Sequence, residues 1–167
     1  MARTTEDTTG TAAPDAVAPG LREDPRITTF GLFVELAGAL STGMNKDMDR
    51  ECGIPMTWFE VLLRLGRTPG HRLRMVELAN QISFTDSGLS RLADRMERAG
   101  LIDRELDRTD RRGTLAVLTP AGGDLLDRAL AVHLDGVQAR VFDHLDERDV
   151  AVFERLLRTL LAANRRS

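Results

Sequence analysis

The feature that most constrains this chain is the stretch from residue 85 to residue 120, where the spacing of apolar side chains changes twice. Apolar residues recur three and four positions apart as far as Gly100, which indicates an amphipathic helix ended by a glycine. The apolar runs at residues 101–102 and 114–118 are typical of strands, and a charged hairpin tip separates them. Thr119 and Pro120 then suit the cap and the first position of another helix. The stretch therefore predicts a helix, a two-stranded wing and a second helix in direct succession.

Helical patterns continue on both sides of this stretch. Apolar stripes at helical spacing predict helices over residues 27–51, 57–67 and 120–142, and a last helix that Asp146 caps. A short helical segment at residues 76–82 precedes the helix at residues 85–99, for which Thr85 suits the N-cap. We therefore predict a fold that is mainly α with a small two-stranded β wing. In this fold a winged helix-turn-helix is joined to a helical region.

The helix predicted over residues 85–99 has two different faces. Its apolar residues share one side, whereas the opposite side carries hydroxyls and arginines. Serine can bond to several base edges and arginine can pair bidentately with guanine, so this second face suits the major groove of DNA. Taken alone, the pattern fits an ordinary solvated helix face better. The candidate DNA-binding residues of this helix are Thr85, Asp86, Ser87, Gly88, Ser90, Arg91, Arg95 and Arg98.

The predicted hairpin tip adds a second basic element. Arg108, Arg111 and Arg112 follow the helix directly, and a narrow minor groove attracts arginine. The chain has a formal net charge of −3, but 11 of its 23 lysines and arginines fall within residues 64–112. Phosphate binding depends on such a local basic face and not on the charge of the whole chain. Helix and wing together favour a DNA-binding protein, and a winged-helix module that binds proteins without sequence-specific DNA binding is the alternative.

Several other classes of protein are disfavoured. The sequence has no Gly-rich phosphate loop, no paired-cysteine metal spacing and no HExxH motif, so we expect no enzyme, no catalytic residue, no metal and no cofactor. No apolar run approaches the roughly 18–20 residues that span a bilayer, and the N-terminus lacks a signal-peptide core. We therefore expect a cytoplasmic protein. Cys52 is the only cysteine, and a small, partly buried side chain explains it better than a redox switch does.

Three motifs resemble the MarR family of bacterial repressors. Residues 89–102 (LSRLADRMERAGLI) resemble the recognition helix of that family and its exit. Residues 107–113 (DRTDRRG), followed by 118–122 (LTPAG), resemble the wing and the start of the next helix. Residues 54–62 (IPMTWFEVL) are similar to the second helix. The resemblance covers roughly residues 28–163 and is most specific over residues 85–122.

The resemblance implies a homodimer that binds a pseudo-palindromic DNA operator. It implies that Arg112 enters the minor groove and that Asp94 pairs with Arg112 and so orients the wing. Many members release DNA when a small phenolic or lipophilic ligand binds between the dimerisation and DNA-binding regions. Peroxide-sensing members carry a reactive cysteine near the start of the first helix. Cys52 lies at the far end of that helix, which argues against this mechanism here.

We expect the chain to divide into three functional parts. Residues 1–24 have almost no large apolar side chains, so we expect a disordered tail. Residues 53–119 form the winged helix-turn-helix DNA-binding domain. Residues 25–52 and 120–165 form the helical dimerisation region, because their apolar stripes have no partner inside so small a DNA-binding core. Pairing these stripes between two chains would remove them from water.

A candidate effector site surrounds the only tryptophan. Trp58 lies on the helix that links the first helix to the helix-turn-helix, and Met44, Met48 and Met56 lie near it in the sequence. Methionine suits adaptable apolar sites. Plain core packing explains each residue on its own slightly better. As a group, the four residues are our candidate site for a small phenolic or lipophilic effector.

Overall fold

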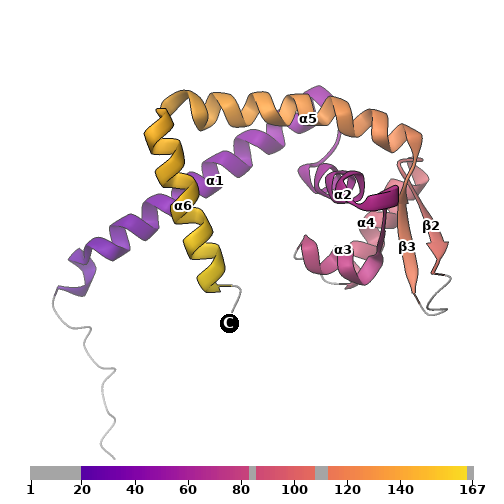
Figure 1. Cartoon of the computed structure of the whole chain (residues 1–167), viewed down its shortest axis with the longest axis horizontal. Coiled ribbons are helices and arrows are strands. Elements are labelled where there is room, and N and C mark those ends of the chain that lie inside the picture. The colour runs from indigo at the N-terminus through magenta and orange to yellow at the C-terminus, as the bar shows by residue number, and fades with distance from the viewer. Residues whose placement is uncertain (1–19, 83–85, 108–112, 165–167) are drawn as a thin grey trace, which may run out of the picture. The chain divides into compact units, whose positions relative to one another are not determined.

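The computed structural model describes residues 20–82, 86–107 and 113–164. Most of the predicted tail, the predicted cap Thr85 and the wing-tip arginines Arg108, Arg111 and Arg112 lie outside these residues. The chain forms two compact units that divide after Gly38. The elements, shown in Figure 1, are η1 (Leu21–Glu23), α1 (Pro25–Cys52), α2 (Met56–Arg67), η2 (Pro69–His71), β1 (Arg72–Arg74), α3 (Met75–Gln81), α4 (Asp86–Arg98), β2 (Ile102–Leu106), β3 (Thr114–Leu118), α5 (Pro120–Arg140), η3 (Phe142–His144) and α6 (Glu147–Asn164).

The fold is mainly α with a small antiparallel sheet, as the sequence predicts, but the sheet has three strands instead of two. Strands β2 and β3 form the wing, with Ile102 opposite Leu118 and Leu106 opposite Thr114. The third strand, β1, pairs with the other edge of β3, so the order is β1-β3-β2. The sequence analysis missed β1 because it has three residues and only one apolar side chain, Leu73. Its strand character comes from pairing with β3.

The predicted caps are found at the ends of the helices. The Thr119 hydroxyl accepts a hydrogen bond from the Gly122 N–H at 3.0 Å, and Pro120 occupies the first position of α5. Gly100 follows α4 with a φ of 73°, a left-handed conformation that glycine adopts without strain. The Asp146 carboxylate accepts from the Asp149 N–H at 2.8 Å and caps α6.

The core of the second unit lies where α2, α3 and α4 meet the sheet. Side chains with at most 2% exposure fill it; they come from these three helices, from β2 and β3, and from Met48 of α1 and Ala129 of α5. In Figure 1 the sheet lies beside α2 and α4, and the contacts of α4 with β2 and of α2 with β3 agree with this view. The largest of these side chains are Phe59, Met48, Leu62, Leu65, Leu78, Leu89, Leu92, Met96, Ile102 and Val61.

Helix α1 carries a large amount of exposed apolar surface. Of its residues only Met48 is buried, whereas Phe30 and Phe33 are 67% and 52% exposed. Its most apolar window has a mean hydropathy of 1.3, so by length and composition α1 passes the test for a membrane span, contrary to our expectation. One such helix near an N-terminus is weak evidence for a membrane, because the core helix of a soluble protein and a signal sequence have the same length and composition.

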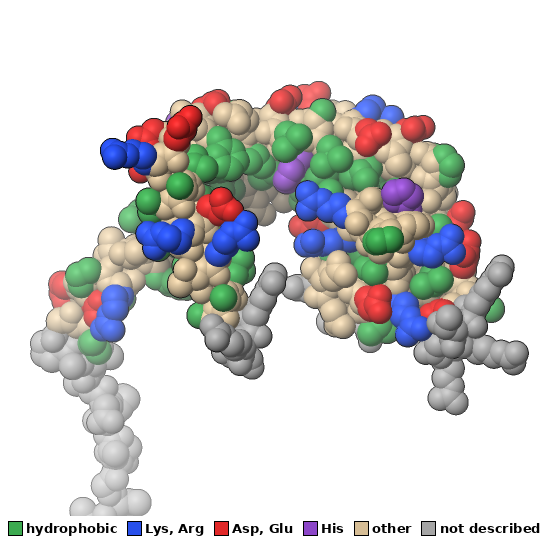
Figure 2. Space-filling model, in the orientation of Figure 1, with side chains coloured by type: hydrophobic (Ala, Val, Ile, Leu, Met, Phe, Trp, Pro, Cys, Tyr) green, Lys and Arg blue, Asp and Glu red, His purple; other side chains and the backbone are tan. Residues whose placement is uncertain are grey.

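Helix α6 has the same character on a smaller scale. None of its described residues is buried. Val152, Leu156 and Leu160 recur every fourth residue, so they lie on one face, and each is 45–56% exposed. Figure 2 shows apolar side chains interleaved with arginines and acids on the visible face of this helix.

Candidate nucleic-acid interface

Helix α4 presents one apolar and one basic face. Leu89, Leu92, Ala93 and Met96 are at most 2% exposed and hold the helix on the core. The other face carries the exposed side chains of Ser90, Arg91, Arg95 and Arg98. The three arginines line a shallow groove of about 440 Å³ together with Asp94 and Gly88, another residue expected at this face. The side chains of Asp86 and Ser87, also expected at this face, lie outside the described residues.

The carboxylate of Asp94 is held by an arginine of the wing strand β2. The guanidinium of Arg104 forms an ion pair with Asp94 and another with Glu97, one helical turn further along α4. Its Nε donates to Glu97 Oε2 at 2.9 Å, and its Nη2 donates to the same oxygen at 2.6 Å. The pKa of Arg104 is raised, first by the hydrogen bond to Glu97 and then by the bond to Asp94.

Sequence reasoning missed Arg104. It ended the first wing strand at residue 102, so the direction of the side chain at position 104 was not considered. The predicted partner of Asp94, Arg112, lies outside the described residues, and that pairing stays a prediction. The signal that could have found Arg104 is the alternation along residues 102–106, which places it on the same side of the sheet as Ile102, toward α4.

The base of the wing tip is fixed by a second ion pair. Asp107 is only 6% exposed, and its Oδ2 lies 2.6 Å from Nη2 of Arg74, at the end of β1. The backbone N–H of Asp107 donates to the Gly113 carbonyl at 2.9 Å, which closes the hairpin where the tip begins and ends. A buried carboxylate is stable only when it is paired in this way. The tip that carries the predicted arginines thus starts from an anchored point.

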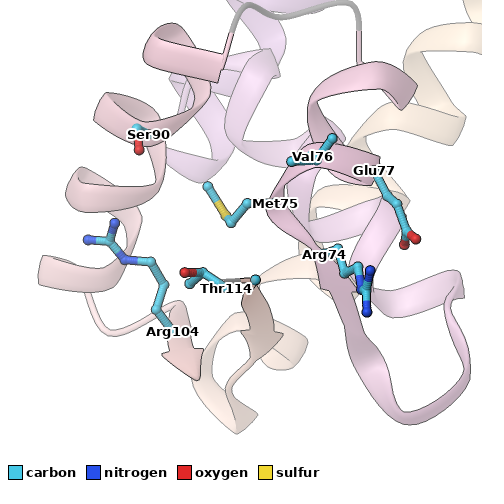
Figure 3. A pocket seen from close by; sticks show the side chains of 8 residues that line it. Arg74, Met75, Val76, Glu77, Ser90, Arg104 and Thr114 are labelled. Carbon is cyan, nitrogen blue, oxygen red and sulfur yellow. The ribbon is translucent and has the colours of Figure 1, made fainter. Parts of the chain in front are cut away.

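A cleft of about 480 Å³ separates the start of α3 from α4 and the wing. Figure 3 shows Arg104 extending from the wing strand toward the helix that carries Ser90, while Arg74 lies on the other side of the cleft. Met75 extends into the space between them. Each of the two arginines is paired with a carboxylate, as described above. The Arg104 pair therefore joins the wing to α4, whereas the Arg74 pair joins the end of β1, directly before α3, to the base of the wing tip.

The comparisons with known proteins decide the family. The family model described as the MarR family matches residues 53–113. The chain is 30% identical to Sco3205, a MarR family transcriptional regulator from Streptomyces coelicolor whose crystal structure contains DNA, over 84% of this chain and 91% of that one, with a TM-score of 0.78. The chain belongs to the MarR family. Members of this family are transcriptional regulators, and the winged helix-turn-helix is the part that the family model covers.

Two further structures show the same MarR fold. AbsC, a MarR family transcriptional regulator from Streptomyces coelicolor, is 29% identical over 86% of this chain and 97% of its own, with a TM-score of 0.80. Wild-type MarR from E. coli in its apo form is 25% identical over 78% and 93%, with a TM-score of 0.66. The search of the curated proteins gives no match. Both structures extend the likeness beyond residues 53–113 to the long helices.

In this MarR-family chain the three methionines of the candidate effector site come together in space. Met44, Met48 and Met56 line a small cavity with Asp47 and His133, and this cavity is too small to admit a water molecule. Trp58 is not in its wall. The His133 ring stacks on Phe59, with centroids 4.7 Å apart.

Two polar atoms near this region are buried without a hydrogen-bond partner among the described residues. They are Nε1 of Trp58 and Nδ1 of His133. Burial lowers the pKa of His133, because the charged imidazole loses hydration there.

The charge on the visible surface is mixed. Figure 2 shows acidic side chains interspersed with the basic ones over the winged-helix part, without a wide patch of one sign. The described residues contain no cluster of three or more side chains able to hold a metal ion. Among the described residues, the groove along α4 brings three arginines together with one acid, Asp94.

Proposed function

We propose that this MarR-family regulator is a cytoplasmic, homodimeric repressor that binds a pseudo-palindromic DNA operator. The observation that carries the proposal is the exposed face of α4, where Ser90, Arg91, Arg95 and Arg98 stand on a helix whose other face is locked into the core. A rigid helix of this kind can enter a major groove, where arginine and serine read base edges. The DNA in the crystal structure of the similar regulator Sco3205 supports this role.

The wing supplies the second contact in this proposal. Arg108, Arg111 and Arg112 would approach a minor groove and the phosphates from the anchored hairpin base at Asp107 and Gly113. Phosphate and minor-groove contacts fix the register of the protein on the duplex, while α4 reads the sequence. Asp94 would orient the wing, and the structure supplies one partner for it in Arg104.

The dimer would form through the long helices outside residues 53–119. Apolar side chains on α1 and α6, including Phe30, Phe33 and Leu156, are about half exposed or more. Soluble chains rarely leave this much apolar surface in water, so a second copy is the simplest partner. In this proposal residues 25–52 and 120–165 form the dimerisation region, and the winged helix-turn-helix between them binds one half of the operator.

The methionine cluster is the proposed effector site. Met44, Met48 and Met56 meet beside the unpartnered Nδ1 of His133, with Trp58 on the adjoining helix α2. The cavity is too small to hold even a water molecule, so a phenolic or lipophilic ligand would have to displace flexible methionine side chains. Binding there would lower DNA affinity if the ligand prefers the form that cannot bind the operator.

Selection of duplexes from a random-sequence library by the purified full-length chain tests the proposal. We expect one enriched motif with two inverted half-sites whose centres lie about one helical turn, roughly 10 base pairs, apart or a multiple of it. Arg91→Ala should change base preference within each half-site, by about 1–3 kcal/mol for a bidentate contact. The control Arg22→Ala removes an equally charged, exposed side chain that lies outside both the DNA-binding domain and the dimerisation region, and it should leave the motif unchanged.

Two results would contradict the proposal. Absence of any enriched motif at low salt would favour the alternative, a winged-helix module that binds proteins. A single half-site without inverted symmetry would contradict the dimer while leaving DNA binding in place.

A further inference from the structure

The DNA-facing helix α4 carries two acids on the side nearest the wing. Asp94 and Glu97 are 46% and 37% exposed, so neither carboxylate is hidden by the fold. Asp94 also lines the groove that contains Arg91, Arg95 and Arg98. Carboxylates at this place repel DNA phosphates unless a cation balances them.

The cation that balances both of them is Arg104. Its backbone lies at the centre of β2, opposite the fully buried Ala116 of β3, so the position of the side chain is set by the sheet. Its guanidinium spans from the strand to the helix and binds carboxylates on two successive turns of α4. Arg104, Asp94 and Glu97 therefore form one clamp between α4 and the wing. Figure 3 shows the Arg104 side chain extended toward the helix.

The other ion pairs nearby have a different role. Arg72 lies 3.4 Å from Glu105 across the sheet, and both side chains are 51% exposed. That pair joins β1 to β2 and does not reach α4. Arg104 and Arg72 therefore carry the same charge in the same small sheet, but only Arg104 of these two reaches α4.

We infer that Arg104 is a positioning residue for DNA binding, which holds the wing and α4 at the spacing that lets both contact the duplex at once. The inference rests on the proposed DNA-binding function. The distance between the major and minor grooves of DNA is fixed. If the wing moves relative to α4, either the wing loses its contacts with the minor groove and phosphates, or α4 is displaced from the bases in the major groove. Arg104 also keeps Asp94 and Glu97 directed away from the phosphates, but this screening is the smaller part of its role.

Three variants separate positioning from simple charge balance. Arg104→Gln removes the clamp and leaves two unbalanced acids. Arg104→Lys keeps the charge but lacks the planar fork that binds two carboxylates together. The triple variant Arg104→Gln, Asp94→Asn and Glu97→Gln removes the clamp and makes the protein one unit more positive than wild type. The control Arg72→Gln removes the same charge from the same sheet without touching α4.

Binding is measured by fluorescence anisotropy with the duplex that the wild-type chain selects. We expect Arg104→Gln to weaken binding about tenfold, which is about 1.4 kcal/mol. The Arg104→Lys and triple variants should also bind more weakly than wild type, whereas Arg72→Gln should stay within about twofold. Tighter binding by the triple variant than by wild type would show that Arg104 only balances charge, and wild-type binding by Arg104→Gln would show that it does neither.

Hydrogen exchange without DNA tests the positioning role independently of the function. Backbone amides of β2 should exchange several-fold faster in Arg104→Gln than in Arg72→Gln, because local opening of the wing becomes easier. Equal protection in the two variants would overturn the inference. Faster exchange together with a wild-type chain that selects no DNA would instead contradict only the proposed function.

Discussion

Substitution of Gly122 by alanine tests how the wing is connected to α5. A Cβ at this position would lie 2.1 Å from the Leu101 carbonyl oxygen and 2.9 Å from Cδ1 of Leu118. The Leu101 oxygen belongs to the backbone at the start of the wing, and it accepts a hydrogen bond from the Thr119 N–H at 3.2 Å. An alanine fits only if the start of α5 and the backbone at Leu101 move apart by roughly one ångström or more, to ordinary contact distance.

The expected cost follows from three terms. Forcing a methyl group into a filled site costs about 1–3 kcal/mol, and loss of the Thr119–Leu101 hydrogen bond costs about 0.5–1.5 kcal/mol. The higher helix propensity of alanine returns up to about 1 kcal/mol. We therefore expect Gly122→Ala to lower the free energy of unfolding by about 0.5–4.5 kcal/mol.

The next residue provides a matched control. A Cβ on Gly123 would meet nothing within 4 Å, so Gly123→Ala should gain only the propensity term and be as stable as wild type or up to about 1 kcal/mol more stable. Urea unfolding at one fixed protein concentration, followed by far-UV circular dichroism, measures both variants. If Gly122→Ala is as stable as Gly123→Ala, the close approach of Gly122 to Leu101 is not a constraint and the reasoning fails.

Two further predictions concern stability. Burial lowers the pKa of His133 below its ordinary 6.5, so the unfolded chain binds a proton more readily than the folded protein. The free energy of unfolding should therefore fall as the pH drops below about 6.5, and it should fall less in His133→Leu than in wild type. If the urea midpoint shifts equally in the two proteins between about pH 7.5 and 5.5, the prediction is contradicted. Thr119→Ala removes the cap of α5 and the bond to the Gly100 carbonyl, at a cost of about 1–2 kcal/mol in urea unfolding. The exposed Thr159→Ala should be nearly neutral, and a neutral Thr119→Ala would show that the cap is dispensable.

Part of the candidate site could be predicted because its signals are local. The amphipathic pattern of α4 is complete within the helix, so the apolar and basic faces follow from helical spacing alone. Helical spacing therefore predicts the basic residues Arg91, Arg95 and Arg98 on the exposed face, with Ser90 as its polar, uncharged member. The effector site was less predictable, since Met44, Met48 and Met56 meet only when α1 packs near α2 and α5, and His133 joins them from α5.

What the sequence by itself determined is the order and the ends of the helices. The capping bonds that Thr119 and Asp146 accept come from backbone N–H groups three residues further along the chain, and Gly100 ends α4 through its own left-handed conformation, so residue type and near neighbours are sufficient for these ends. Tertiary structure alone decided the third strand β1, the Arg74–Asp107 pair and the Arg104 clamp. These features form only when strands and helices that are distant in the sequence come together in space. A short charged segment such as β1 becomes a strand because it pairs with β3, and nothing in its own sequence shows that partner.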